Sequence, residues 1–243
     1  MGAGKFSFKR VVLGSGSFSF EEVMFENVDV SFERTSFGFE KVSFYKSWFH
    51  TLSLRFCHLD GFIDLRVQQC LSIDLSNTIV RDIIDLNPHE FNSVVQTLYM
   101  GGMRLIGRFY IDWKRNQVKS LINSQTQSSH RLRAEQFRIL KENFKNLGLY
   151  NSEDYAYVEF KRNESRANLT ESVAQNRLRG LYQYPLYWFK LVLFDNAGLY
   201  ATSPVRVLIT MVNSFIVFSL LYLLLLWKTS ADIVASVDDH LSM

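Results

Sequence analysis

The sequence predicts a mixed α+β membrane protein with an N-terminal β-solenoid, a helical hairpin and one C-terminal transmembrane helix. Three observations support this fold class. Apolar residues recur every five positions in the first third of the chain, basic helical stretches follow, and residues 207–227 form an apolar run without ionisable side chains. The length of 243 residues accommodates one or two domains. The 47% hydrophobic content excludes wholesale disorder, because the chain has enough apolar surface to bury.

Two rows of apolar residues, offset by two positions, define the predicted solenoid. A period of five fits neither an α-helix nor an alternating strand, whereas fixed repeats are typical of solenoids, whose units pack on their neighbours. The central row is Phe39, Phe44, Phe49, Leu54 and Leu59, and the leading row, two residues ahead, is Phe37, Val42, Ser47, Leu52 and Cys57. After one-residue slips, the pattern continues upstream as Phe18/Phe20, Val23/Phe25 and Val28/Val30, and downstream as Ile63/Leu65 and Ile73/Leu75.

These repeats resemble those of the pentapeptide-repeat family, whose chains wind into a four-sided, right-handed β-helix. The resemblance covers about residues 16–86 and implies a pentapeptide-repeat-like β-helix as the first domain, residues 1–86. The leading row departs from the family pattern, which favours small residues there, because residues such as Phe18 and Val42 are bulky. An antiparallel sheet of short Phe-rich strands is the alternative prediction for this region.

Residues 87–180 are predicted to cap the solenoid and to form a basic helical hairpin. Asn87-Pro88-His89-Glu90 predicts the start of a short helix, and residues 103–113 are predicted to form a strand. The first long helix has one apolar stripe and ends near Gly148, and Ser152-Glu153-Asp154 begins the second helix. The apolar stripe consists of Leu132, Phe137, Leu140, Phe144 and Leu147.

Basic residues dominate the region that precedes the apolar run. Residues 104–206 carry 17 Lys and Arg against 9 Asp and Glu, a net charge of +8. This charge predicts contacts with anionic lipids of the inner leaflet, and a solvated helical face is the alternative. Nucleic-acid binding is not predicted, because no recognition motif accompanies the charge. The candidate lipid contacts are Lys190, Arg206, Arg177 and Arg179. The aromatic segment 181–204 is predicted to be juxtamembrane, either interfacial or packed back on the preceding domain.

Residues 205–228 are predicted to form the transmembrane helix. The 21-residue apolar run is about 31 Å long as a helix, which matches the hydrocarbon core of a bilayer. Ser203-Pro204 suits a helix start, and Trp227 suits the membrane interface. Asn213 and Ser214 are strongly polar, and we expect them either to make a helix–helix contact or to be tolerated within the run. The alternative is a buried core helix, which requires burial on every face.

The charge distribution also predicts an orientation. By the positive-inside rule, the basic region places the N-terminal part in the cytoplasm, and residues 229–243 form a short extracytoplasmic tail. The start of the sequence, MGAGKFSFKR, lacks the apolar stretch of a signal peptide, so none is expected. The two cysteines, Cys57 and Cys70, fit a reducing compartment.

No catalytic, cofactor-binding or metal-binding site is predicted. Gly14-Ser15-Gly16-Ser17 lacks the following Gly-Lys-Ser/Thr of a phosphate-binding loop, and His58 beside Cys57 has no further ligands at metal-site spacing. The sequence also lacks nucleophile-elbow and zinc-protease motifs. We therefore expect a protein that is not an enzyme and that needs no cofactor.

A second resemblance extends over residues 87–211. The blocks GMRLIGRFYIDW, AEQFRILKENFKNLG, EDYAYVEFKR and GLYATSPVRVLITM resemble the cytoplasmic and first-membrane-helix portion of bacterial pentapeptide-repeat proteins fused to a two-helix potassium-channel-like pore. This resemblance implies the regulatory and assembly part of a cation transport protein in the bacterial inner membrane, homo-oligomeric when the channel half is present. Because no Thr-x-Gly-Tyr-Gly filter follows the helix, the sequence is interpreted as truncated before the pore and non-conducting by itself. The alternative is a tail-anchored scaffold that presents the solenoid to a cytoplasmic protein partner.

Overall fold

The computed structural model describes two compact units, Met1–Gln183 and Tyr184–Met243, and each is considered by itself. The first unit contains the solenoid and the helices that follow it, and the second contains a long apolar helix. The described residues are 4–14, 16–38, 41–87, 90–176, 180–196, 199–200 and 202–241, without the side chains of residues 193, 196 and 230–241.

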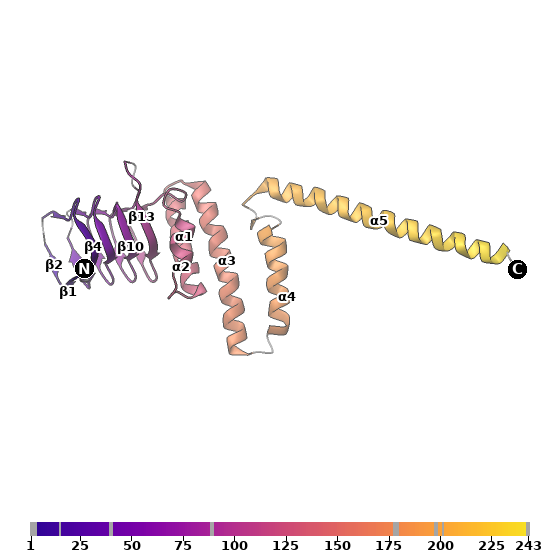
Figure 1. Ribbon diagram of the computed structural model, residues 1–243, viewed down its shortest axis with the longest axis horizontal. Helices are drawn as coiled ribbons and strands as arrows, with labels where there is room; N and C mark the ends of the chain where they lie inside the picture. The colour runs from indigo at the N-terminus through magenta and orange to yellow at the C-terminus, as the bar shows by residue number, and fades with distance from the viewer. Residues whose placement is uncertain are drawn as a thin grey trace. The chain divides into compact units, whose positions relative to one another are not determined.

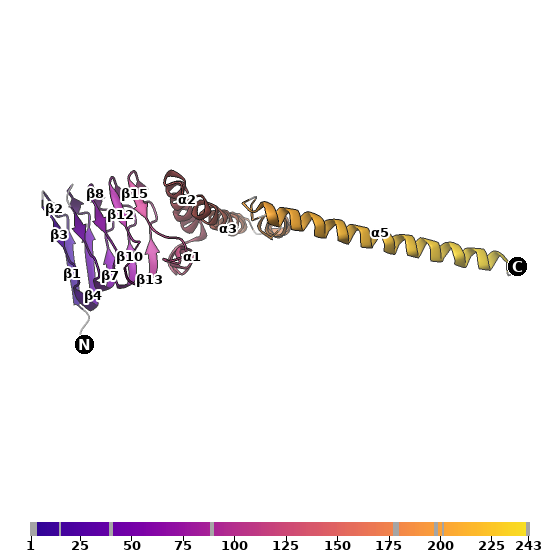
Figure 2. The same cartoon turned by 90° about the horizontal axis from the view of Figure 1, so that it is seen from above.

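Three parallel β-sheets form the N-terminal solenoid and confirm the predicted fold class (Figures 1 and 2). Each sheet takes one strand from each successive turn, so segments far apart in the sequence lie side by side. Sheet A consists of β1 (Gly4–Lys9), β4 (Met24–Glu33), β7 (Trp48–Ser53), β10 (Gln69–Asp74) and β13 (Val94–Tyr99). Sheet B consists of β2 (Val12–Leu13), β5 (Ser36–Phe37), β8 (His58–Leu59), β11 (Ile79–Val80) and β14 (Arg104–Leu105). Sheet C consists of β3 (Phe18–Ser19), β6 (Val42–Ser43), β9 (Ile63–Asp64), β12 (Ile83–Asp85) and β15 (Arg108–Tyr110).

All of these strand pairs are parallel, which excludes the antiparallel alternative. In sheet A, β7 pairs with β10 in two short pieces that are separated at His50. These two pieces, together with sheets B and C, give four short paired segments per turn, as expected for a pentapeptide-repeat-like solenoid. In the regular turns, stacked residues lie 21 positions apart, as do Val42, Ile63 and Ile84. The one residue beyond four repeats of five explains the downstream slip in the sequence pattern, between Cys57 and Ile63.

Both predicted rows of apolar side chains lie inside the solenoid. Their buried members are Val42, Phe44, Ser47, Phe49, Leu52, Leu54, Cys57 and Leu59. Rings of successive turns stack on one another: Phe20 on Phe44 with 5.7 Å between ring centroids, and Phe25 on Phe49 with 5.8 Å. The core is therefore a column of side chains in which each turn covers the one before it. Phe39 lies outside the described residues.

Two residues belong to the opposite row from the one that the sequence pattern predicted. Phe37 pairs with Leu59 and so lies in the central row, whereas Val30 pairs with Leu52 and lies in the leading row. The difference at Val30 follows from a bulge in β4 between Phe25 and Asp29. The difference at Phe37 follows from one additional residue between β5 and β6, because Phe37 lies 22 positions before its partner Leu59 whereas Val42 lies 21 positions before Ile63. The bulge inserts residues but leaves the five-residue spacing on either side intact, so the hydrophobic pattern alone does not reveal it.

The solenoid also continues past residue 86, where the sequence pattern placed its end. Strands β13, β14 and β15 add another turn, in which Leu98 pairs with Ile73 and Phe109 pairs with Ile84. This turn is longer than the one before it, since Ile84 follows Ile63 after 21 residues and Phe109 follows Ile84 after 25. The additional residues interrupt the five-residue spacing, which is why the pattern was not recognised there.

Two local predictions near this turn are corrected. Pro88 and His89 lie outside the described residues, and Glu90–Ser93, which were expected to continue a short helix, lead into β13 without helical structure. The strand expected over residues 103–113 is divided into β14 and β15 by a corner that contains Gly107. A Cβ atom at Gly107 would lie 1.7 Å from the carbonyl oxygen of Asp82, so the close approach of the two turns requires glycine.

A left-handed backbone conformation recurs at the corner that follows sheet A. The residues are Arg10, Arg34, Phe56, Asn77 and Gly102, with φ between 55° and 69°. This conformation costs a bulky residue such as Phe56 about 1–2 kcal/mol. The guanidinium groups of Arg34 and Arg55 lie 5.7 and 5.5 Å from the Phe56 ring centroid, and these cation–π contacts offset part of that cost.

Three helices complete the first unit: α1 (Val118–Asn123), α2 (His130–Asn146) and α3 (Tyr150–Gln175). The central residues of the predicted apolar stripe of α2, Phe137, Leu140 and Phe144, are fully buried, whereas Leu132 at its start is exposed. Gly148, with φ of 72°, follows α2 in the left-handed conformation that commonly ends a helix. α2 and α3 pack against each other as the predicted helical hairpin (Figure 1).

Three helical segments follow the hairpin. They are α4 (Gly180–Lys190), the π-helical η2 (Leu191–Asn196) and α5 (Pro204–Leu241). In α4 the aromatic side chains of Trp188 and Phe189 are exposed. α5 begins at the predicted Pro204 and stays helical to Leu241, through the segment that was expected to be a short tail.

Candidate membrane helix and polar clusters

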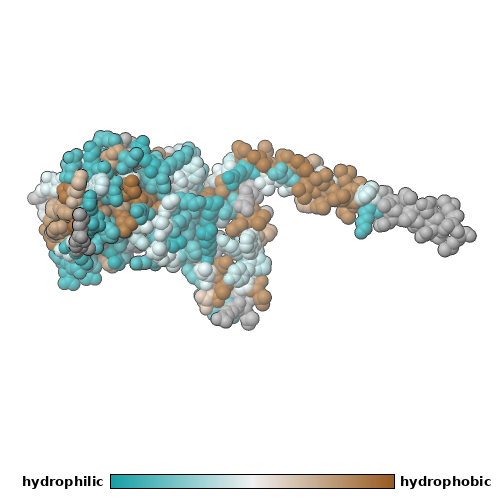
Figure 3. Space-filling model, in the orientation of Figure 1, coloured by the Kyte–Doolittle hydropathy of each residue, from teal (hydrophilic) through white to brown (hydrophobic). Residues whose placement is uncertain are grey.

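The apolar helix α5 is the strongest functional feature of the chain. Its segment Pro204–Thr229 is long and apolar enough to span a membrane, and no part of its apolar window is buried. Hydrophobic residues cover most of this part of α5 in Figure 3, with hydrophilic residues among them near its start. The alternative of a buried core helix requires burial of these side chains, which α5 does not have. Exposed apolar surface of this extent is typical of a helix that contacts lipid or another protein.

The polar residues of α5 differ in how their hydrogen-bonding groups are satisfied. The Thr210 hydroxyl donates to the Arg206 carbonyl oxygen at 2.9 Å, within the helix itself. Asn213 and Ser214, the predicted helix–helix contact, both have exposed side chains. Neighbouring residues of an α-helix point about 100° apart, so these two side chains do not share one face.

Two of the four predicted lipid-contacting residues lie in the described part of the chain. Lys190 is the last residue of α4, and Arg206 is exposed in the first turn of α5. Arg177 and Arg179 lie outside the described residues. Contact of these side chains with lipid stays a prediction.

Amide side chains of α2 cover the last turn of the solenoid. The Asn143 amide accepts a hydrogen bond from the Phe109 N–H at 3.0 Å and donates to the Phe109 carbonyl oxygen at 2.8 Å. Gln136 accepts from the Met100 N–H at 3.0 Å and exchanges hydrogen bonds of 2.7 and 3.0 Å with the Gln125 amide. These amides take the place of a further turn, because they satisfy backbone groups that such a turn would pair with.

Sequence reasoning did not identify these amides, although a signal was present. Gln136 and Asn143 are seven residues apart and lie on the same buried face as Leu140. An uncharged polar residue at a position that the apolar stripe predicts to be buried needs a hydrogen-bond partner. The sequence therefore indicated buried amides, but not the strand that they would contact.

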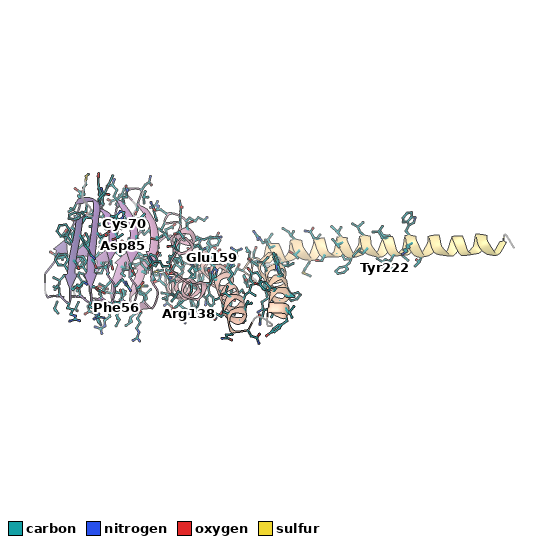
Figure 4. The ribbon with its side chains drawn as sticks, turned by 60° about the horizontal axis from the view of Figure 1, so that its bottom comes forward. Phe56, Cys70, Asp85, Arg138, Glu159 and Tyr222 are labelled. Carbon is teal, nitrogen blue, oxygen red and sulfur yellow. The ribbon has the colours of Figure 1, made fainter. Side chains whose placement is uncertain are left out.

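A buried carboxylate, Glu159, joins α1 to α3 (Figure 4). Its oxygens lie 3.0 Å from the Lys119 ammonium and 2.7 Å from the Arg162 guanidinium, and they accept a hydrogen bond from the Asn123 amide at 3.2 Å. Burial alone raises the pKa of Glu159, but the hydrogen bonds from Lys119 and Arg162 outweigh it, so the pKa lies below its ordinary value. Glu159 is therefore ionised near neutral pH and holds α1 against α3.

A second buried carboxylate, Asp64, lies on the outer side of sheet C. Arg66 donates to its two oxygens at 2.9 and 2.6 Å, and the guanidinium lies 4.9 Å from the centroid of the Tyr45 ring. The hydrogen bond to Asp64 raises the pKa of Arg66 above its ordinary value. Paired and stacked in this way, Asp64 and Arg66 are structural groups that stabilise successive turns.

The two thiols are structural as well. Cys57 donates to the Phe32 carbonyl oxygen at 2.9 Å, and Cys70 donates to the Ser72 carbonyl oxygen at 3.2 Å. Burial raises the pKa of Cys57 to about 11 and that of Cys70 to about 12, so both are neutral and unreactive thiols. Within the described residues, no group of three or more His, Cys, Asp or Glu side chains is placed to hold a metal ion.

The outer face of sheet A carries two columns of polar side chains, most of them small. The columns are Lys5, Asp29, Thr51, Ser72 and Thr97, and Ser7, Ser31, Ser53, Asp74 and Tyr99. One pair of neighbours within a column is hydrogen-bonded: the Thr51 hydroxyl donates to an Asp29 oxygen at 2.6 Å. The face is therefore an array of hydrogen-bonding groups that repeats once per turn, and part of it (Thr51, Ser53, Ser72, Asp74 and Tyr99) lines a pocket.

Comparisons with known proteins give no family for this chain: no protein-family model, no curated protein and no solved structure matches it. The description of the solenoid as pentapeptide-repeat-like therefore rests on its spacing and sheet topology. The channel resemblance of residues 87–211 stays a prediction from the sequence.

Proposed function

We propose that this chain is a membrane-anchored scaffold, in which α5 holds a β-solenoid at the surface of a bilayer for interaction with a protein partner. One observation carries the proposal. The first unit encloses its own apolar core, whereas α5 exposes apolar side chains over the length of a bilayer's hydrocarbon core. One part of the chain is thus suited to water and another to lipid. The role is non-catalytic.

The charge distribution supports an orientation for this scaffold. The net charge of +8 over residues 104–206 precedes α5, and Lys228 is followed by three aspartates, which favours a cytoplasmic solenoid. Lys190 and Arg206 lie close in sequence to the start of the span, where cations interact with anionic headgroups. The same attraction applies to Arg177 and Arg179.

The outer face of sheet A is the surface that we assign to the partner. Its hydroxyl and carboxylate columns are regularly spaced, and a polar face offers hydrogen bonds without the cost of exposing an apolar patch. We assign a protein rather than a nucleic acid, because Asp29 and Asp74 balance Lys5 and Arg55 on this face, which therefore lacks the excess of positive charge that phosphate binding requires.

Membrane integration is tested by alkaline carbonate extraction of the full chain expressed in cells. We expect the wild-type chain to stay with the membranes, and the double variant Leu220→Arg/Leu221→Arg to be released, because each arginine at the centre of the span costs about 2.5–3.5 kcal/mol. The matched control is Leu132→Arg/Leu149→Arg, which changes two exposed leucines outside α5 and should stay membrane-bound. Release of the wild-type chain would overturn the proposal.

Orientation is tested by cysteine labelling of intact cells with a membrane-impermeant thiol reagent. Thr126→Cys, in the first unit, should be protected until the cells are opened, whereas Ser236→Cys, beyond the span, should react at once. Cys57 and Cys70 are buried and contribute little background. The reverse pattern of labelling contradicts the assigned orientation.

A second candidate function is the cytoplasmic regulatory part of a potassium-channel-like cation transport protein. It is favoured by the four sequence blocks between residues 87 and 211 that resemble such proteins. In planar bilayers with potassium and sodium on opposite sides, the purified 243-residue chain should give no unitary currents, because one apolar helix supplies no ring of ion-coordinating carbonyl groups. Reproducible potassium-selective currents from this chain would refute the non-conducting assignment.

A further inference from the structure

We propose that α5 associates, within the membrane, with α5 of a second copy of this chain, in parallel and through the helix face that contains Asn213. This proposal rests on the proposed function, since it requires α5 to be inserted in a bilayer. The scaffold proposal does not say what α5 contacts within the membrane, and we assign that contact to a second copy of this chain.

Asn213 lies within the apolar span of α5, away from the interface. Asn213 follows Val207, the first residue of the apolar run, by six residues, or about 9 Å along the helix, so it lies well inside a hydrocarbon core of about 30 Å. The asparagine side chain is too short to reach water from this depth. Arg206 and Tyr222 lie nearer the two ends of the span, and their longer side chains can extend toward the interface.

The amide of Asn213 has hydrogen-bonding groups that α5 itself does not satisfy. A hydroxyl in a helix can donate back to the carbonyl oxygen four residues earlier, as Thr210 does to Arg206 at 2.9 Å. The asparagine amide has two donor hydrogens and an acceptor oxygen, and within the described residues nothing bonds to it. In lipid, such a group is satisfied by a neighbouring helix.

The two sides of α5 differ in the side chains that they carry. Residues at heptad spacing from Asn213 form one narrow stripe along the helix, and the opposite side is bulky and largely aromatic. The stripe consists of Thr210, Asn213, Val217, Leu220 and Leu224, and the opposite side consists of Met211, Phe215, Phe218 and Tyr222. Aliphatic side chains at this spacing interdigitate between two helices, with a polar residue that fixes the register. Ser214 lies about 100° from Asn213 and outside the stripe.

A second copy fits this face better than a different protein does. The amide is complementary to itself, since the donor of one copy faces the acceptor of the other. In a parallel pair, two copies with the same orientation place Asn213 at the same depth without further adjustment. A C2 pair formed in this way buries the same stripe on both helices.

The face is mapped by disulfide cross-linking of the full chain in membranes. Val217→Cys and Leu220→Cys, in the stripe, should form cross-linked dimers under mild oxidation, whereas Phe215→Cys and Phe218→Cys should not. The wild-type chain controls for Cys57 and Cys70, which are buried. Equal cross-linking at all four positions, or cross-linking only at Phe215→Cys and Phe218→Cys, overturns the proposal.

The role of the amide is measured by energy transfer between labelled copies in liposomes. Asn213→Leu should raise the dissociation constant of the pair by about 3- to 30-fold, and Ser214→Leu, as the matched control, should leave it unchanged. An unchanged constant for Asn213→Leu overturns the proposal. Carbonate extraction of the same samples separates the two failures: an integrated but monomeric wild-type chain refutes only the pairing, and an extracted chain refutes both.

Discussion

The two ends of the solenoid differ in how their terminal turns are covered. At the end next to α2, side-chain amides bond to the backbone of the last turn, and Leu98, Met100 and Phe109 are fully buried. At the other end, β1, β2 and β3 are edge strands, and the side chains of Phe6 and Val12 are 49% and 78% exposed. Each turn of a solenoid is stabilised by its neighbours, so a terminal turn needs a substitute for the missing one.

The amides of α2 provide that substitute, and the described residues place no equivalent group over β1. The protection that β1 has is electrostatic, because Lys5 and Lys9 lie on the edge strand and charged side chains discourage pairing with other strands. Hydrogen bonding at one end and charge at the other both compensate for a missing neighbouring turn. Only the hydrogen bonding adds stability to the adjoining turn.

The largest effect is expected in the middle of the solenoid, where neighbours are present on both sides. Leu59→Ala should lower the free energy of unfolding by about 2–5 kcal/mol, because Leu59 is fully buried between turns. His58→Ala, at the exposed neighbouring residue of the same strand, should cost less than about 0.5 kcal/mol. Urea unfolding of the two variants measures both values. Equal losses would contradict the assignment of inward and outward positions.

The next effect is expected at the capped end. Asn143→Ala leaves the buried N–H and carbonyl oxygen of Phe109 without their amide partner, which should cost at least about 2 kcal/mol, since each buried group left unpaired costs about 1 kcal/mol or more. Asn146→Ala, at an exposed asparagine of the same helix, is the control and should be nearly neutral. A neutral Asn143→Ala would mean that the amides of α2 do not stabilise the last turn.

Much of this fold was predictable from local spacing, and the rest depends on contacts between distant residues. The rows from Val42 to Leu59, the apolar stripe of α2 and the start of α5 at Pro204 were predicted, because each follows a period or a cap within a few residues. The bulge after Phe25 and the last turn were not, because inserted residues leave no local mark.

The polar clusters were missed for a related reason. The hydrogen bond between Gln136 and Met100 joins residues 36 positions apart, and Glu159 meets Lys119 at a separation of 40. A sequence shows that an amide or a carboxylate lies on a buried face, but the partner is known only when the fold brings it there.

Glycine substitutions at the two ends should have smaller effects on stability, and the effects should differ between the ends. At the capped end, Gly107→Ala places a methyl group against the Asp82 carbonyl oxygen and should cost about 1–3 kcal/mol. At the open end, Gly14 has no atom within 4 Å of a Cβ position, so Gly14→Ala should be neutral or slightly stabilising. Thermal unfolding of both variants gives the comparison. A destabilising Gly14→Ala together with a neutral Gly107→Ala would reverse it.

The smallest effect is the pH dependence that Glu159 contributes at the capped side. Because the folded state lowers the pKa of Glu159, its stabilisation is present above the ordinary glutamate value of about 4.3 and is lost as the pH falls through the folded-state pKa. Glu159→Gln should therefore lose less stability between pH 6 and 3 than the wild-type chain, as measured by urea unfolding at each pH. Parallel pH profiles for the two proteins would contradict the ionised state of Glu159.

The difference between the two ends is tested most directly by hydrogen–deuterium exchange of the full chain in lipid nanodiscs, read at Arg10 and Phe109. The Arg10 N–H donates to the Glu33 carbonyl oxygen and the Phe109 N–H donates to the Asn143 amide oxygen, both at 3.0 Å, so the two hydrogen bonds have the same length. If the amides of α2 replace a neighbouring turn and nothing replaces it at β1, Phe109 exchanges at least about 100-fold more slowly than Arg10. Exchange at Arg10 that is as slow as at Phe109 would contradict this, and would show that the open end is as well protected as the capped one.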